Sequence, residues 1–76
     1  MEHLDRITRN VNVMQGKACI RGMRLTVGTV VGLVASGRSS KEILDAYPYL
    51  EEEDIRQSLS YAALRVRERE IELPAA

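Results

Sequence analysis

Residues 16–27 constrain the fold more than any other part of this sequence. Gly16 and Gly22 bracket a short β-prone piece, and Thr26 stands directly before an apolar run. Glycine adopts the positive φ of tight turns without a steric penalty. A threonine hydroxyl accepts an otherwise unpaired N–H of a helix's first turn. The segment therefore predicts a β-turn-β element, residues 7–25, that leads straight into a helix.

The expected β element has several parts. Residues 7–13 are rich in β-branched side chains and predict a strand, residues 15–17 a turn, and residues 18–20 a second strand. Arg24 and Leu25 predict a brief return strand. Gly22 lies between them and the second strand, where we expect a positive φ.

Two helices should follow. Residues 26–36 carry valines at the i, i+3, i+4 and i+7 spacing of one helix face, and Gly37 is a stop signal. Ser39 and Glu42 form a capping box that starts a helix over residues 40–47. Pro48 ends that helix, because the residue before a proline is pushed out of the α region.

A third, longer helix is expected over residues 51–70, with a tail at residues 71–76. Four acidic residues at 51–54 complement the positive end of its dipole. The whole is a single domain: a mostly α, three-helix unit of the helix-turn-helix type, preceded by a short N-terminal β hairpin.

Composition narrows the function classes. Cys19 is alone, which fits a reducing compartment, and the longest apolar run is too short to span a membrane, so a cytoplasmic location without membrane contact is expected. The residues show no spacing typical of a metal site, a cofactor site or a phosphate loop. We therefore expect neither an enzyme nor a bound cofactor.

The charge is unevenly spread. Residues 1–41 hold seven basic and two acidic residues, a net of +5, whereas residues 42–76 hold four basic and nine acidic residues, a net of −5. The basic half is suited to a nucleic-acid face, although the asymmetry equally fits self-association or solubility alone.

DNA binding through the start of the third helix is disfavoured, since its acidic residues would be repelled by phosphates. The better candidates for phosphate contact are basic residues of the β element and of the junction between the first two helices. The alternatives are ordinary surface charges, or a pairing of Arg24 with acids of the third helix. The candidates are Lys17, Arg21, Arg24, Arg38 and Lys41.

Two further surfaces are expected. A core this small often needs a second copy, and the third helix carries an apolar seam too long for it. Its C-terminal end interleaves basic and apolar residues, which fits partner binding. The dimer candidates are Ile20, Leu25, Leu59, Ala62 and Val66, and the partner-binding candidates are Arg65, Arg67, Arg69, Ile71 and Leu73.

The sequence at residues 16–27 resembles the bacterial family called domain of unknown function 433, whose motif is Gly-Lys-Pro-x-Ile-x-Gly-Thr-Arg-hydrophobic. The resemblance continues through Tyr47-Pro48-Tyr49-Leu50, Glu53-Asp54-Ile55 and Tyr61-Ala62, and covers residues 7–63. Ala18 and Met23 depart from the family's Pro and Thr, and Glu51 stands where a Thr or Ser caps the third helix.

The resemblance implies a homeodomain-like fold, often dimeric, and an antitoxin that neutralises a PIN-like ribonuclease toxin and represses its operon by binding double-stranded DNA. The alternatives are a stand-alone helix-turn-helix DNA-binding regulator and a dimerisation module that does not bind DNA.

Overall fold

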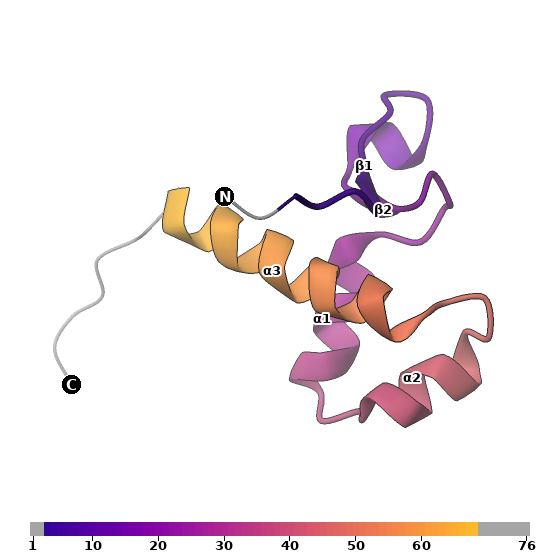
Figure 1. Cartoon of the computed structure of the whole chain (residues 1–76). Helices are drawn as coiled ribbons and strands as arrows, with labels where there is room; N and C mark the ends of the chain where they lie inside the picture. The colour runs from indigo at the N-terminus through magenta and orange to yellow at the C-terminus, as the bar shows by residue number, and fades with distance from the viewer. Residues whose placement is uncertain (1–2, 69–76) are drawn as a thin grey trace, which may run out of the picture.

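A computed structural model describes residues 3–68 (Figure 1). Three helices follow a two-stranded antiparallel hairpin, which confirms the predicted mostly helical fold class. In chain order the elements are β1 (Ile7–Thr8), η1 (Met14–Gly16), β2 (Cys19–Ile20), α1 (Val27–Ala35), α2 (Ser40–Ala46) and α3 (Glu52–Glu68).

The hairpin is shorter than the sequence predicts. β1 pairs with β2 so that Ile7 faces Ile20, but the strand predicted over residues 7–13 ends at Thr8. The Asn10 carboxamide accepts a hydrogen bond from the N–H of Asn12 at 2.9 Å, and the Asn10 carbonyl accepts one from Val13 at 2.8 Å. Asparagine side chains compete in this way with a strand ladder, and the chain turns instead of extending.

The turn that follows is left-handed. In η1, φ is +49° at Met14, +60° at Gln15 and +80° at Gly16. Glycine takes this conformation freely, whereas other residues bear a steric penalty of about 1–2 kcal/mol each. None of the three side chains is buried, so the hydrophobic core does not compensate for this strain.

A second tight turn follows β2. Arg21 and Gly22 have φ of +46° and +73°, and the N–H of Met23 donates to the carbonyl of Ile20 at 2.8 Å. Positive φ at both central residues is typical of a type I′ turn, and the expectation for Gly22 is confirmed. The chain returns along β2 as predicted, since the N–H of Ile20 donates to the carbonyl of Leu25 at 3.0 Å. Arg24 and Leu25 nevertheless form no strand: the pairing is a single bridge from Cys19 to Thr26, because the chain enters α1 there.

The helix ends follow their local signals. The Thr26 hydroxyl accepts the N–H of Thr29 at 3.1 Å and caps α1. At the other end Gly37 has φ +94° and its N–H donates to the carbonyl of Val34 at 3.0 Å, while the Arg38 N–H donates to that of Leu33 at 3.1 Å. These two bonds form a Schellman motif.

The predicted capping box at the start of α2 is also present. The Ser39 hydroxyl accepts the N–H of Glu42 at 3.1 Å, and the Glu42 carboxylate accepts the N–H of Ser39 at 2.9 Å. The α2 helix ends before Tyr47, one residue ahead of Pro48. Both ends therefore follow from residues close by in the sequence.

The core lies where the hairpin and the three helices meet, and it includes side chains of α1, α2 and the first part of α3. The fully buried side chains of α3 all lie in its first two turns, at Asp54, Ile55, Gln57 and Ser58. Residues 59–68 are called the α3 arm below: Tyr61 still packs against the core, and the last turns of the helix project past the rest of the described chain (Figure 1). The core cluster consists of Ile20, Leu25, Val27, Val30, Ile43, Leu50 and Ile55.

Candidate functional site

A buried carboxylate joins the hairpin to the start of α3. Asp54 is fully buried and accepts a hydrogen bond from Arg6 Nη1 at 3.1 Å and two from Arg21, from Nε at 3.1 Å and Nη2 at 2.9 Å. It also accepts the N–H of Glu51 at 2.8 Å. Burial raises the pKa of Asp54, but the bonds from Arg21, Glu51 and Arg6 outweigh burial and hold that pKa below its usual value.

Arg21, one of the predicted DNA contacts, belongs to the same cluster. The second hydrogen bond of Arg21 Nη2, at 2.7 Å, goes to the carbonyl of Tyr49. The Arg21 guanidinium therefore fixes the turn between α2 and α3. The sequence alternative of a pairing between Arg24 and acids of the third helix is wrong in its residue, since Arg21 makes that pair.

Neighbouring acids at the start of α3 also have partners within the chain. Glu51 accepts a hydrogen bond from Arg6 Nη1 at 2.6 Å. Glu53 accepts from Arg56 Nε at 2.8 Å and from Gln57 at 2.9 Å, and these two contacts lower the pKa of Glu53 to about 2. The negative charge that a DNA phosphate would meet here is therefore partly compensated.

The five predicted DNA contacts do not form one surface. Lys17 and Arg24 lie around the hairpin, whereas Arg38 and Lys41 lie past the far end of α1. An α-helix as long as α1 separates the two groups by about 13 Å. Lys41 is paired with Asp45 at 3.1 Å. If these residues bind DNA, the pair Lys17 and Arg24 and the pair Arg38 and Lys41 would each contact it separately.

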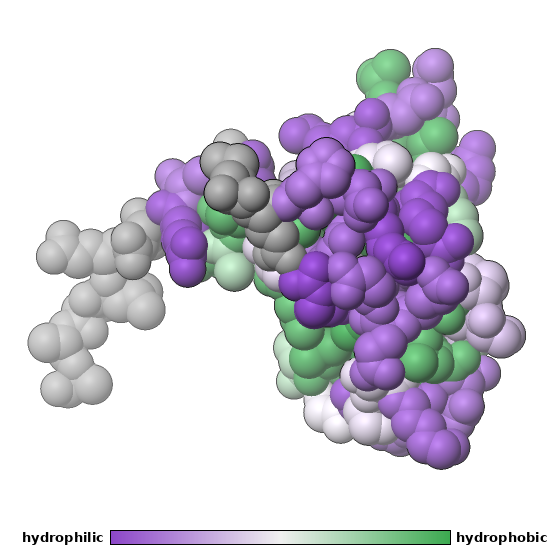
Figure 2. Space-filling model, viewed as in Figure 1, coloured by the Kyte–Doolittle hydropathy of each residue, from purple (hydrophilic) through white to green (hydrophobic). Residues whose placement is uncertain are grey.

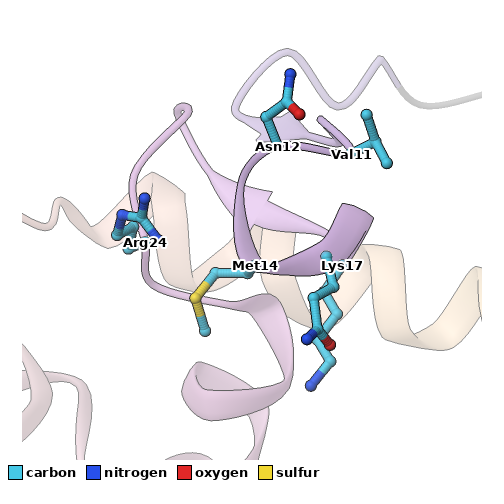
Figure 3. Close-up of a pocket in the computed structure, with 6 residues that line it drawn as sticks. Val11, Asn12, Met14, Lys17 and Arg24 are labelled. Atoms are coloured by element: carbon cyan, nitrogen blue, oxygen red, sulfur yellow. The ribbon is translucent and has the colours of Figure 1, made fainter.

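A hollow beside η1, called the hairpin pocket below, brings Lys17 and Arg24 together. Its volume is about 430 Å³. Figure 3 shows Arg24 and Lys17 on opposite sides of the Met14 side chain. Neither basic side chain has an ion pair or hydrogen bond to another described residue. The lining residues are Val11, Asn12, Met14, Gln15, Lys17 and Arg24.

The α3 arm carries apolar side chains at its surface. Leu59 is 39% exposed and Val66 is 67% exposed. A groove of about 480 Å³ runs between the arm and the start of α1, with Val31, Tyr61 and Ala62 in its lining. Hydrophobic residues also reach the surface beside α1 in Figure 2. This is surface chemistry that suits contact with another protein.

Two of the predicted dimer residues are placed elsewhere. Ile20 is fully buried and Leu25 is 8% exposed, so both side chains pack in the core of one chain and present little surface to a second. Both complete the apolar contact between hairpin and helices. The dimer surface expected from the sequence is thereby reduced to Leu59, Ala62 and Val66.

The predicted partner-binding residues are only partly described. Arg65 lies on α3 and pairs with Glu68 at 3.1 Å, and Arg67 is exposed on the same helix. Arg69, Ile71 and Leu73 lie outside the described residues. An exposed pair such as that of Arg65 contributes little to stability, so a partner can displace it.

Residues 3–68 contain no group of three or more His, Cys, Asp or Glu side chains that could hold a metal ion. None of the helices described is long and apolar enough to cross a membrane. Cys19 is buried and without a disulfide partner.

Sequence reasoning missed the Asp54 cluster. Asp54 was grouped with its neighbours as a helix-dipole acid, and the partners of its carboxylate come from positions 33 and 48 residues away. The local signal was its position three residues after Glu51, where a side chain closes back onto the helix start. The hairpin pocket was missed because the left-handed turn that shapes it has no sequence signal at Met14 and Gln15.

Comparison with known proteins identifies relatives but no established activity. The chain is 36% identical over 56 residues to the uncharacterized protein y4eO of Sinorhizobium fredii, a match that covers 74% of this chain and 25% of that protein. It also resembles the crystal structure of a DUF433 member protein from Anabaena variabilis, with a TM-score of 0.77 and 31% identity.

That structural match covers 84% of this chain and 63% of the Anabaena chain, so the present chain spans less than two thirds of either relative. The family model described as protein of unknown function (DUF433) matches residues 7–62, from β1 into the α3 arm. The chain is therefore a member of the DUF433 family.

Proposed function

We propose that this protein is an antitoxin-like binding module that docks on and neutralises a PIN-like ribonuclease toxin. The α3 arm and the residues after it are the docking element. The observation that carries the proposal is the arm itself: from residue 59 to residue 68 no side chain is fully buried, yet apolar groups continue along it. A helix that extends past its own core is free to pack on another chain.

The chemistry of the arm supports a protein partner. Val66 is two-thirds exposed, and Arg67 offers a charged group beside it. Arginine next to exposed apolar surface is typical of the energetically important part of an interface. The antitoxin role comes from the family resemblance, and the arm supplies a surface that suits it.

The proposal includes a homodimer. Leu59, Ala62 and Val66 follow one another at steps of three and four residues, which places them on one face of α3 as an apolar seam that suits packing against another helix. A domain of this size has a thin core, and a second copy would cover the exposed part of the seam.

Co-expression with a PIN-like ribonuclease toxin tests the proposed function. We expect the wild-type protein to restore growth of cells that produce the toxin, and Arg67→Glu or removal of residues 65–76 to abolish that rescue. Arg38→Glu is the matched control, because Arg38 is also exposed but lies beyond the end of α1. Rescue by the chain lacking residues 65–76 would show that docking does not need the end of the arm, which would contradict the role given to Arg67 and Val66.

DNA binding is the second candidate. It is favoured by Lys17 and Arg24, whose side chains have no ion pair or hydrogen bond to another residue in the range 3–68, and by the partial neutralisation of the acids at the start of α3. Binding to operator DNA should weaken steeply as salt rises, since phosphate contacts release counterions. The absence of a mobility shift with operator DNA at low salt would exclude DNA binding, and only the dimerisation and protein-binding roles would then stand.

A further inference from the structure

We propose that the hairpin pocket binds a phosphate ester, either a free nucleotide or a phosphate of a nucleic-acid strand. This site is separate from the α3 arm and requires no toxin. Two cationic side chains, Lys17 and Arg24, line one hollow of about 430 Å³. That volume lies in the range of small-molecule sites in proteins.

The charge around the hairpin pocket is uncompensated. Arg6 and Arg21, which flank the two strands of the hairpin, donate hydrogen bonds to the carboxylates of Glu51 and Asp54. By contrast, Lys17 and Arg24 contact no carboxylate among the described residues, and no acidic residue lines the pocket. Two cations around a hollow without an acid attract an anion, and arginine binds phosphate oxygens with two parallel hydrogen bonds.

The other residues that line the pocket favour a phosphate ester over inorganic phosphate alone as the ligand. Asn12 and Gln15 bring carboxamides, which both donate and accept hydrogen bonds. Val11 is 78% exposed, and Met14 lies between the two cationic side chains (Figure 3). Since Met14 lines the same hollow, an organic group attached to the phosphate could pack on its side chain. A nucleotide has both parts.

The backbone of η1 shapes the pocket. Met14, Gln15 and Gly16 all have positive φ, which two of them adopt only against a steric penalty. None of the three is buried, so packing does not explain the conformation. The left-handed turn does place two lining residues, Met14 and Gln15, directly before Lys17. Strain of this kind is concentrated at ligand sites.

Calorimetric titration of the full chain tests this site with three probes at low salt: adenosine monophosphate, adenosine and a short DNA duplex. We expect a probe that carries phosphate to bind, and adenosine not to bind. Lys17→Gln and Arg24→Gln should each weaken binding by about tenfold or more, because each removes a charge-assisted contact. Arg56→Gln is the matched control, because Arg56 is an exposed arginine of α3 that lies outside the pocket and pairs with Glu53.

Each outcome has a definite meaning. Binding of adenosine monophosphate that depends on Lys17 and Arg24 supports a free phosphate ester, and binding of the duplex alone with the same dependence supports a nucleic-acid phosphate. The proposal is overturned if neither phosphate probe binds, or if Arg56→Gln weakens binding as much as Arg24→Gln. Both pocket variants alter exposed side chains, and an unchanged circular dichroism melt confirms their folding. Since no toxin is present, failure here leaves the proposed neutralisation untouched.

Discussion

Asp54 is the residue on which the hairpin and α3 most depend. Its buried carboxylate receives hydrogen bonds from two arginines of the hairpin and from the first residue before α3. Arg21 holds a positive φ in the same arrangement. The cluster thus explains why a non-glycine residue occupies the first central position of a turn that favours Asn, Asp or Gly.

Replacement of Asp54 by Asn should destabilise the fold strongly. The amide cannot compensate two guanidinium groups, and breaking a buried ion pair from one side costs about 3–5 kcal/mol. Arg6 and Arg21 are 27% and 38% exposed, so water recovers part of this and we expect about 2–4 kcal/mol. Urea unfolding measures the loss. Glu52→Gln, a neutralised acid two residues away on the surface, should change stability by less than about 0.5 kcal/mol.

Stability should also fall in acid. The pKa of Asp54 is lowered in the folded chain and that of Glu53 falls to about 2, so both carboxylates bind protons more weakly folded than unfolded. Their contribution is complete above the unfolded pKa of about 4 and is lost as the pH falls through the folded values. The urea midpoint should drop between about pH 4 and pH 2, and by less in Asp54→Asn. A midpoint that stays level in this range would contradict the assignment.

Residue-scale features differ in how far the sequence reveals them. The caps at Thr26 and Ser39 were predictable because each partner lies three residues away. The contacts of Asp54 with Arg6 and Arg21 were not, since they depend on how the hairpin folds against α3. A row of acids at a helix start has the same local pattern whether one of them is buried or all are solvated.

At the scale of elements, the glycines of the hairpin and of α1 have opposite roles. Gly22 has φ +73°, and a side chain there is strained although space is available. Gly32 lies in α1 with open space around it and an ordinary helical φ. The backbone conformation at position 22 therefore requires glycine, whereas no contact within the chain requires glycine at position 32.

Alanine at these two positions should therefore shift stability in opposite directions. Gly22→Ala is expected to lose about 1 kcal/mol or more, because the left-handed region is unfavourable for a residue with a Cβ. Gly32→Ala should gain up to about 1 kcal/mol from helix propensity. Thermal melts of the two variants provide the comparison. A gain for Gly22→Ala would mean that the turn changes its conformation.

Element boundaries were predictable for helices and less so for strands. The ends of α1 and α2 follow caps and Pro48 and agree with the sequence to within a residue. The first strand was overestimated because β-branched residues at 11 and 13 suggested extension, while the Asn10 carboxamide folds the backbone into a turn. Strands of only two residues are too short to show the alternating apolar pattern by which a strand is located in a sequence.

At the scale of the whole molecule, the fold keeps three features apart. The buried Asp54 cluster holds the hairpin on α3. The hairpin pocket presents Lys17 and Arg24, which pair with no acid among the described residues, and the α3 arm presents apolar groups. The candidate sites followed from the sequence only in part. Val66, predicted for the dimer, and Arg67, predicted for partner binding, are both exposed. Ile20 and Leu25, also predicted for the dimer, are core residues, because an apolar residue has the same sequence signature in a core and in an interface.

The proposed homodimer makes a prediction at this scale. Leu59→Glu should shift sedimentation from a dimer toward a monomer, since it buries a charge in the apolar seam. Val11→Glu is the control, an apolar-to-acid change at an exposed position of the hairpin loop, and should leave the dimer intact. A wild-type chain that sediments as a monomer at micromolar concentration would rule out a stable dimer.

Hydrogen–deuterium exchange of the protein with and without a bound PIN-like ribonuclease tests the docking element most directly, because exchange reports protection along the backbone. We expect slowed exchange over residues 59–68 when the ribonuclease is bound, with residues 10–24 of the hairpin unchanged. Protection confined to the hairpin, or absent from the arm in a complex that forms, would contradict the account.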